Sequence, residues 1–429
     1  MRHNTDITPT KVHKDAKLGV IPDGWTTPKI SEVFQFINTT SFSRNQLNYD
    51  ADNELFYIHY GDIHATYKKP LLDFEIETNV PRLNNDVELP NSIQYLQDGD
   101  VIIADASEDY EGVGEAIEIK NLNGKVAISG LHTFALRDLN NKTVPGFRTY
   151  IFKNPNVKKA LKTIATGSKV YGISKGNIQK FKIVLPPLSE QQKISQILAT
   201  WDVAINKQEA LIAQKQEQKK ALMQQLLTCE KRFDEFSNTW KLLNFKDIVK
   251  INQGLQIAIS QRLTEKIPNS FFYITNEFLK EGSSYKYYVL NPSDSVKCSF
   301  DDILMTRTGN TGQVVTNVEG VFHNNFFKIN YNKDLISKSF LFYFLTSERT
   351  QYIIQKLAGT STIPDLNHSD FYSIQINLPE LEEQQKIGAV LTTADNQIKA
   401  LQEQLKKLKS QKQGLMQQLL TGKIRVNTN

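Results

Sequence analysis

Two stretches of the sequence decide its fold. Residues 185–228 read LPPLSEQQKISQILATWDVAINKQEALIAQKQEQKKALMQQLLT, and residues 378–421 read LPELEEQQKIGAVLTTADNQIKALQEQLKKLKSQKQGLMQQLLT. They align without a gap at an offset of 193 residues (378 − 185), and about half of their positions are identical. Both copies open with LPxLxEQQKI and close with LMQQLLT. Self-similarity of this kind marks an internal repeat, which has to be recognised before any fold is assigned.

Both copies are predicted to be long helices. In the second copy the apolar residues alternate at spacings of four and three, the seam of a coiled coil, and only Lys412 interrupts them. The first copy has the same seam but places Gln208, Lys215 and Lys219 in it. A helix of this length spans about 60 Å and cannot bury its apolar stripe alone. We expect the two helices to pair antiparallel within one chain; the alternative is that each folds back on its neighbouring domain.

The remaining sequence forms two related domains. Short runs rich in β-formers, broken by Gly, Asn and Asp turns, fill the segments before each helix. One predicted helix near 155–165 and another near 338–357 complete them. The predicted class is therefore α+β, with two β-rich domains separated by two long helices in a pseudo-twofold repeat. The expected boundaries are a tail at 1–17, a domain at 18–184, a helix at 185–230, a domain at 231–377, and a helix with its tail at 378–429.

Composition narrows the class of protein. At 429 residues the chain is too long for one core, and 40% hydrophobic residues fit a globular protein. Two cysteines cannot build a disulfide framework or a four-cysteine zinc site. No apolar run is long enough to span a membrane, and the first twenty residues show no signal peptide, so we expect a cytoplasmic protein.

Charge is distributed unevenly in the first domain. Residues 141–189 carry ten Lys or Arg and no acid, whereas residues 98–118 carry eight acids and no base. A basic face of this kind attracts polyanions such as DNA, although it could equally be a solvated surface balanced by the acids. Two related domains on a rigid spacer suit a polymer with separated sites, and duplex DNA fits that geometry.

The sequence offers little for catalysis. It contains no GxxxxGK[ST] phosphate loop, no HExxH and no glycine-rich methyltransferase loop with an Asn/Asp-Pro-Pro-aromatic motif. Asp105 with Glu118-Ile119-Lys120 resembles the metal site of many nucleases. The alternative is a charged edge strand with chance spacing, because acids are dense there. We expect no catalytic residue and no metal site in this chain.

Several motifs together resemble one family. The alternation of domains and helices, IPDGW at 21–25, both LPxLxEQQKI openings, both LMQQLLT closings and the TRTGNTG loop at 306–312 look like the specificity subunit of Type I restriction-modification enzymes. The first domain departs from this pattern, since its aligned stretch reads ADASEDYEGVG at 104–114. The second domain's opening, SNTWKLLNF, lacks the Pro-Asp-Gly of IPDGW.

The resemblance implies a function and partners. Each domain would read one half of a bipartite, asymmetric site in double-stranded DNA. The paired helices would dock two methyltransferase subunits, and the complex would recruit restriction (motor-nuclease) subunits. S-adenosylmethionine, ATP and Mg²⁺ would then belong to those partner subunits and not to this chain. The alternative, from a different class, is a coiled-coil scaffold whose two domains bind proteins.

Candidate DNA-binding residues are polar side chains and glycines in turn-rich loops, which can reach base edges or phosphates. In the first domain they are Arg44, Asn45, Lys68, Lys69, Gly167, Ser168, Lys169 and Tyr171. In the second domain they are Gln253, Arg262, Lys286, Arg307, Thr308, Asn310, Thr311 and Ser361. Tyr60 and His64 could equally be core residues.

Candidate partner-binding residues are the polar residues repeated at both helix starts. They are Glu190, Gln191, Gln192 and Lys193 in the first copy and Glu383, Gln384, Gln385 and Lys386 in the second. Their repetition suggests two like sites and hence two copies of a partner. The alternative is that they cap the helices and bind the adjoining domains.

Overall fold

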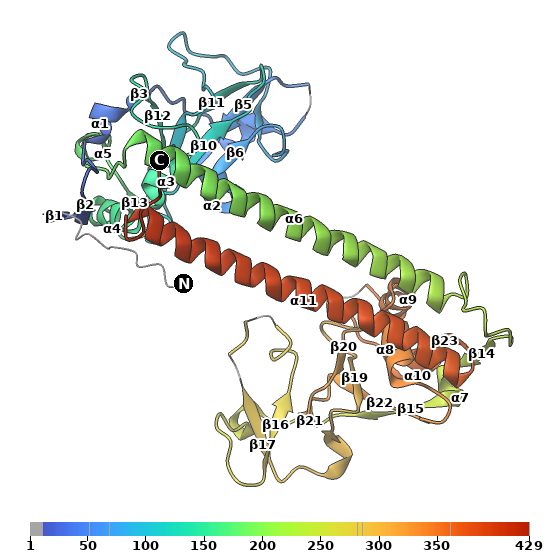
Figure 1. Ribbon diagram of the computed structural model, residues 1–429. Coiled ribbons are helices and arrows are strands. Elements are labelled where there is room, and N and C mark those ends of the chain that lie inside the picture. Colours follow the sequence, from blue (N-terminus) through green and yellow to red (C-terminus); the bar gives the residue numbers. More distant parts are fainter. Residues whose placement is uncertain are drawn as a thin grey trace, which may run out of the picture. The chain divides into compact units, whose positions relative to one another are not determined.

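The computed structural model describes residues 12–50, 52–67, 69–280, 282–284, 286–360 and 362–428. The chain divides into two compact units, unit 1 (residues 1–207 with 405–429) and unit 2 (residues 208–404). Both divisions fall inside long helices, α6 (Leu188–Leu227) and α11 (Leu381–Leu420), each 40 residues long. Figure 1 shows these two helices and the β-rich domain of each unit. The α+β class and the order of domains and helices are confirmed.

The two long helices pack antiparallel within each unit. In unit 1, Asp202 of α6 pairs with Lys412 of α11 at 2.5 Å. In unit 2, Lys219 of α6 pairs with Asp395 of α11, also at 2.5 Å. Residue numbers therefore rise along α6 as they fall along α11. Lys219 and Lys412, which interrupt the apolar seam, form these two ion pairs.

The helix starts also serve the domains. Ile194 and Leu198 are buried in the core of unit 1, and Ile387 and Leu391 are buried in the core of unit 2. Both alternatives from the sequence thus apply, because the first turns of each helix complete a domain while the helices also pair with each other.

Unit 1 is built on two sheets. The five-stranded sheet has the order β3 (Gln35–Ile37), β12 (Thr133–Arg137), β8 (Val101–Ala104), β10 (Ala116–Lys120) and β6 (Leu71–Asp73). The four-stranded sheet has the order β11 (Val126–Ser129), β5 (Leu55–Ile58), β7 (Arg82–Leu83) and β4 (Leu47–Asn48). Two strand pairs are separate, β1 (Val12–Asp15) with β2 (Gly19–Pro22), and β9 (Ala106–Ser107) with β13 (Tyr171–Gly172). Its shorter helices are α1 (Ile30–Val33), η1 (Arg44–Gln46), α2 (Tyr60–Ala65), α3 (Arg148–Lys153), α4 (Pro155–Ile164) and α5 (Lys175–Lys180).

Unit 2 repeats this plan with shorter sheets. One sheet has the order β15 (Val249–Gln253), β22 (Phe326–Tyr331), β19 (Ile303–Thr306) and β20 (Val314–Thr316). The other has the order β17 (Tyr287–Leu290), β16 (Ser270–Ile274), β21 (Gly320–Phe322) and β18 (Lys297–Cys298), and β14 (Lys241–Asn244) pairs with β23 (Gln375–Leu378). Its shorter helices are α7 (Phe245–Ile248), η2 (Ile259–Gln261), η3 (Asp294–Val296), α8 (Lys338–Thr346), α9 (Glu348–Ala358) and α10 (His368–Tyr372).

The shared plan follows from matched strands. β8 lies between β12 and β10 in unit 1, as β19 lies between β22 and β20 in unit 2. In each second sheet a central strand pairs in parallel with a later one, β5 with β11 and β16 with β21. The helix predicted near 155–165 is α4, and the one predicted near 338–357 is divided into α8 and α9 by Ser347, whose side chain accepts from the backbone N of Thr350. Among the described residues no helix is long and apolar enough to cross a membrane.

Candidate nucleic-acid interface

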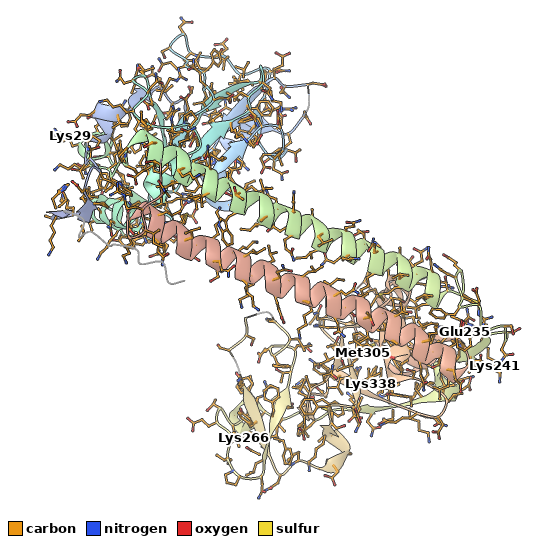
Figure 2. All side chains as sticks on the ribbon, in the orientation of Figure 1. Lys29, Glu235, Lys241, Lys266, Met305 and Lys338 are labelled. Carbon is orange, nitrogen blue, oxygen red and sulfur yellow. The ribbon has the colours of Figure 1, made fainter. Side chains whose placement is uncertain are left out.

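The two units carry a matched position directly after their central strands. In unit 1 this position is Asp105, which follows β8, and in unit 2 it is Arg307, which follows β19. Asp105 N donates to His132 O at 3.0 Å, and Arg307 N donates to Asn325 O at 2.7 Å. Figure 2 draws the side chains on the ribbon and labels Met305, two residues before Arg307.

A second pair of hydrogen bonds completes the match. Ile173 N donates to Asp105 O at 2.8 Å, and Leu366 N donates to Arg307 O at 2.9 Å. We call these two backbone hydrogen bonds at the matched position the backbone frame. The same frame carries an acidic side chain in unit 1 and a basic side chain in unit 2. The difference in charge lies in the side chains alone, because the backbone hydrogen bonds are the same.

In unit 2 the frame holds an arginine–aspartate pair. Arg307 Nη2 lies 3.0 and 2.7 Å from the two carboxylate oxygens of Asp365, and the Thr308 hydroxyl also donates to that carboxylate. Although partial burial opposes the shift, the hydrogen bonds from Thr308 and Arg307 hold the pKa of Asp365 below its ordinary value. Asp365 thus remains ionised and fixes the direction of the guanidinium.

The predicted loop at 306–312 is a tight turn whose tip is exposed. Gly309 and Gly312 have φ of +88° and +91°, which glycine adopts without strain. Asn310 is exposed at the tip. Thr311 is 6% exposed, and its hydroxyl donates to Pro364 O at 2.7 Å. The expectation that Thr311 contacts DNA is corrected on this point, because its hydroxyl is engaged within the loop.

In unit 1 the frame holds a histidine–aspartate pair. His132 Nδ1 lies 3.2 Å from Asp105 Oδ1, and half of the His132 side chain is exposed. The ring of Tyr60 meets the ring of His132 edge to face, with centroids 5.3 Å apart. Burial raises the pKa of Asp105, and the neighbouring imidazole opposes that shift. Tyr60 therefore belongs to this cluster, whereas His132 had no signal in the sequence.

The predicted loop at 166–172 lies beside the same frame. Thr166 and Gly172 exchange backbone hydrogen bonds of 2.9 and 2.8 Å, which closes a turn. Gly167 has φ of +133°, and a Cβ there would lie 1.8 Å from Val170 O. Ser168 and Lys169 are exposed on the turn. Tyr171 packs edge to face on Tyr110 with centroids 5.3 Å apart. The four predicted residues of this loop thus lie together on one exposed turn.

Arg44, another candidate of unit 1, is tied to the helix that begins at Tyr60. Arg44 donates to both carboxylate oxygens of buried Asp62, at 2.7 and 3.1 Å. Asp62 belongs to that helix, α2. Asn45 accepts from the Ser43 hydroxyl, and Lys69 is exposed. Lys68 lies outside the described residues. His64 Nε2 lies 3.0 Å from Ala106 O, so this side chain serves the local packing.

The remaining candidates of unit 2 divide into exposed and inward side chains. Gln253 is exposed and donates weakly to Asn324 O at 3.4 Å, and Lys286 is exposed. Arg262 stacks over Tyr273 and Tyr287, with its guanidinium carbon 5.4 and 5.5 Å from their ring centres. Its packing between two rings gives Arg262 a structural role within the domain. Ser361 lies outside the described residues.

The helix starts hold two matched buried carboxylates. Glu190 is 5% exposed and accepts from the indole N–H of Trp25 at 3.3 Å and from Arg425 Nε at 2.9 Å. Glu383 is 1% exposed and accepts in the same way from Trp240 at 3.0 Å and from Arg232 at 2.9 Å. The two arginines are 193 residues apart, as the two carboxylates are.

The next residue is also turned inward in both copies. Gln191 accepts from Val144 N at 3.0 Å, and Gln384 accepts from Ser337 N at 2.9 Å. The expectation of partner binding is therefore corrected for Glu190, Gln191, Glu383 and Gln384, which fix each helix to its own domain. Gln192, Lys193 and Gln385 are exposed and Lys386 is half-buried, so for these four partner binding stays a prediction.

The nuclease-like residues are not brought together. Glu118 is 1% exposed and accepts from Thr149 N at 3.2 Å and from Gly146 N at 2.5 Å, next to α3. Lys120 pairs with Asp73 at 3.1 Å, while Asp105 pairs with His132. Among the residues that the structure describes, no three His, Cys, Asp or Glu side chains gather in a way that could hold a metal ion.

Comparison with known proteins identifies the family. The Type I restriction modification DNA specificity domain matches this chain twice, at residues 22–214 and 237–410. The protein assigned as the MjaX specificity subunit in Methanocaldococcus jannaschii is 24% identical, with 97% of each chain covered. The MjaVIII specificity subunit of the same organism is 27% identical over 65% of this chain and 70% of its own length.

Solved structures share the fold. The crystal structure of the S subunit of a Type I restriction-modification system from M. genitalium superposes with a TM-score of 0.52 at 14% identity, covering 92% of this chain and 96% of that one. A structure from a study of complex assembly and conformational transition in the Type I restriction-modification system gives a TM-score of 0.57 at 17% identity, covering 94% and 99%. The chain therefore belongs to the Type I restriction-modification DNA specificity family, and it is a specificity subunit with two recognition domains.

Proposed function

We propose that each unit reads one half of a split DNA site through the side chains at its matched position. The observation that supports this most is the exchange of Asp105 for Arg307 at the matched position, where the backbone hydrogen bonds are the same but Asp105 pairs with His132 and Arg307 pairs with Asp365. Two sites with the same frame but opposite side chains suit an asymmetric sequence, in which the two halves present different base edges.

The chemistry of the two pairs suggests different bases. In unit 2, Arg307 is a donor, and arginine donating to guanine O6 and N7 is the commonest specific contact in the major groove. In unit 1, Asp105 is an acceptor, and the half-exposed His132 has its Nδ1 beside that carboxylate. Acceptors of this kind suit the amino group of cytosine or adenine. The exposed lysine side chains of Lys169, Lys69 and Lys286 would contact DNA phosphates. Such contacts position each domain on the DNA without reading its sequence.

We infer that this chain supplies recognition and assembly and performs no chemistry itself. Two methyltransferase subunits would bind the paired helices, and restriction subunits would join that complex in the cytoplasm. S-adenosylmethionine, ATP and Mg²⁺ would be bound by those partners. The repeat supports two like docking sites, because Gln192 and Lys193 recur as Gln385 and Lys386 at the same helical positions.

Exchange of one domain tests this function. Residues 12–184, which include the whole β1–β2 hairpin, are replaced by the corresponding domain of another family member. The chain is produced with its methyltransferase subunits, and the methylation motif is mapped across a genome. We expect a split motif in which only one half changes. An unchanged motif, or no methylation motif at all with a folded chain, contradicts the proposed function.

A further inference from the structure

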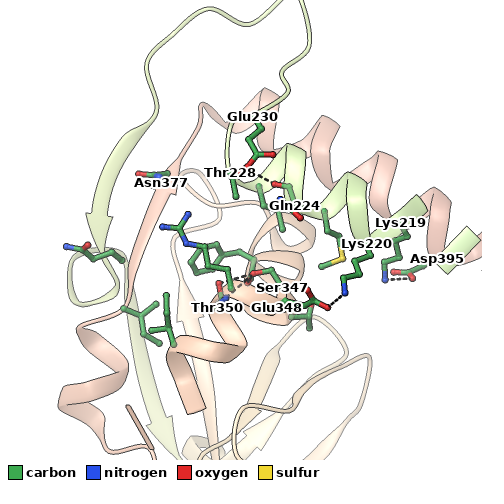
Figure 3. Close-up of a pocket in the computed structure, with 18 of the residues that line it drawn as sticks. Lys219, Lys220, Gln224, Thr228, Glu230, Ser347, Glu348, Thr350, Asn377 and Asp395 are labelled. Carbon is green, nitrogen blue, oxygen red and sulfur yellow. Dashed lines mark hydrogen bonds and ion pairs between the residues drawn. The ribbon is translucent and has the colours of Figure 1, made fainter. Parts of the chain in front are cut away.

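A groove with a volume of about 1090 Å³ lies within unit 2, between α6, α9 and the sheet of β14 and β23. Figure 3 shows Lys219 and Lys220 of α6 paired with Asp395 and Glu348 at its rim. Apolar side chains lie behind this rim. They include Met223, Leu227, Ile353 and Leu357.

The matching place in unit 1 is filled by the chain's own N-terminal hairpin, β1 with β2. Asp15 of the hairpin pairs with Lys182 at 3.5 Å. A Cβ at Gly19 would lie 3.5 Å from Asn156 Nδ2. Leu18 and Ile21 are 1% and 0% exposed, in one core cluster with Val157 and Leu420. The hairpin is therefore an integral part of unit 1.

The residues that hold the hairpin correspond to residues that line the groove. At the repeat offset of 193, Lys182 matches Gln375, Asn156 matches Arg349, Val157 matches Thr350 and Leu420 matches Leu227. All four of these matching residues line the groove of unit 2. In the repeat, the groove of unit 2 therefore corresponds to the place that the hairpin fills in unit 1.

Unit 2 has no hairpin of its own to place there among its described residues. The chain between α6 and β14 instead follows the course of the C-terminal tail of unit 1, since Arg232 binds Glu383 as Arg425 binds Glu190. As a result, Ile353 and Leu357 are only half-buried and Leu242 is 61% exposed, whereas Ala160, which matches Ile353, is 3% exposed. Apolar surface of this kind is typical of a site that another segment covers.

We propose that this groove binds an extended apolar segment of a partner protein, the methyltransferase subunit, at the position that the hairpin occupies in unit 1. The inference rests on the proposed function for the identity of the partner. By analogy with Leu18 and Ile21, the segment carries two branched apolar side chains three positions apart. The exposed guanidinium of Arg349, where unit 1 has Asn156, favours an acidic side chain beside them.

A second copy of this chain is a poorer occupant. The segment of a second copy that would match by analogy is the hairpin itself, and its Leu18 and Ile21 are already buried in their own unit. Donating them would expose the core of unit 1. The groove also breaks the pseudo-twofold repeat, so we expect it to act on one of the two methyltransferase subunits.

The test compares two neighbouring residues of α9. Ile353→Asp places a charge in the groove, and Tyr352→Asp places the same charge on a side chain that is 71% exposed and does not line it. The full chain is titrated with the methyltransferase subunit by calorimetry. We expect the Y352D chain to bind like the original chain and the I353D chain to bind one subunit at least tenfold more weakly. Ile353→Trp, which fills the groove without a charge, guards against loss of folding and should weaken the same step.

Three outcomes overturn the proposal. In the first outcome, the original, I353D and I353W chains bind both subunits with equal affinity. The groove then does not bind the methyltransferase subunit, while the proposed function still holds. A chain that binds no methyltransferase subunit at all removes the proposed function and the groove together. Self-association of the chain alone that I353D abolishes, measured by sedimentation, assigns the groove to a second copy.

Discussion

The carboxylate of Glu190 accepts a hydrogen bond from the indole of Trp25 at 3.3 Å, across 165 residues of chain. The same contact recurs between Glu383 and Trp240 at 3.0 Å. In each unit an arginine from beyond the far end of the other long helix completes the cluster. The start of one helix, the end of the other and the first residues of a domain are thereby fixed at one buried point.

Loss of the first carboxylate should destabilise unit 1. Glu190→Ala leaves the Trp25 N–H and the Arg425 guanidinium without their acceptor, and we expect the free energy of unfolding to fall by about 2 kcal/mol. Glu190→Gln keeps an acceptor for Trp25 and should cost less. Denaturant unfolding measures both, with Gln192→Ala, an exposed neighbour, as the control. Equal stability of the E190A and Q192A chains would show that the cluster contributes nothing.

Glu118 should make stability depend on pH. Burial raises the pKa of Glu118 to about 7, whereas an unfolded glutamate keeps its ordinary value of 4.5. The folded chain therefore binds more protons between these two values, and the free energy of unfolding should fall as pH rises through that window, by up to about 3 kcal/mol. Urea unfolding at several pH values measures this slope. A Glu118→Gln chain should lose it, and an unchanged slope in that variant would contradict this assignment.

Gly167 should be required for the turn in unit 1. Gly167→Ala would place a Cβ 1.8 Å from Val170 O at a φ of +133°, so the turn must rearrange. We expect at least tenfold weaker DNA binding with little change in melting temperature, because the turn is exposed. Gly176→Ala is the matched control, since nothing lies within 4 Å of its added Cβ. Binding of G167A equal to that of G176A would exclude this turn from the interface.

Two kinds of basic residue should differ in their effect on DNA binding. Arg307→Ala should cost about 1–3 kcal/mol on the preferred sequence and relax the preference at one base pair. Lys169→Ala should instead weaken binding to all sequences alike and reduce the salt dependence by about one phosphate contact. Binding titrations at several salt concentrations, on the original site and on sites with single substitutions, separate the two patterns. The same response from both variants would contradict the roles assigned to them.

The sequence predicts the scaffold better than the site. The copies at 185–228 and 378–421 suffice for two helices and two related domains, because a gapless repeat with an apolar seam has few other solutions. The loops at 166–172 and 306–312 were predictable because glycine and small polar residues concentrate there. His132 was not, since its partner Asp105 is distant in the sequence and only the strand pairing of β8 with β12 brings them together.

The burial of the repeated residues distinguishes a structural role from a partner-binding role, which their repetition in the sequence does not. Glu190 and Glu383 are identical residues at identical positions, and such a pattern is equally typical of a binding surface and of a structural contact. Only the packing of Trp25 and Trp240 against them shows that they are structural. The groove beside α9 likewise has no signal in the sequence, because it lies where unit 1 places its hairpin and the described residues of unit 2 place none.

Base reading by the two matched positions is tested best by substituting both of them in parallel. Chains carrying Asp105→Ala with His132→Ala, or Arg307→Ala with Asp365→Ala, are each produced with the methyltransferase subunits, and the methylated motif is mapped. We expect each pair of substitutions to relax the base preference in a different half of the split motif and to leave the other half unchanged. Changes in the same half for both variants, or no change in either motif, would contradict it.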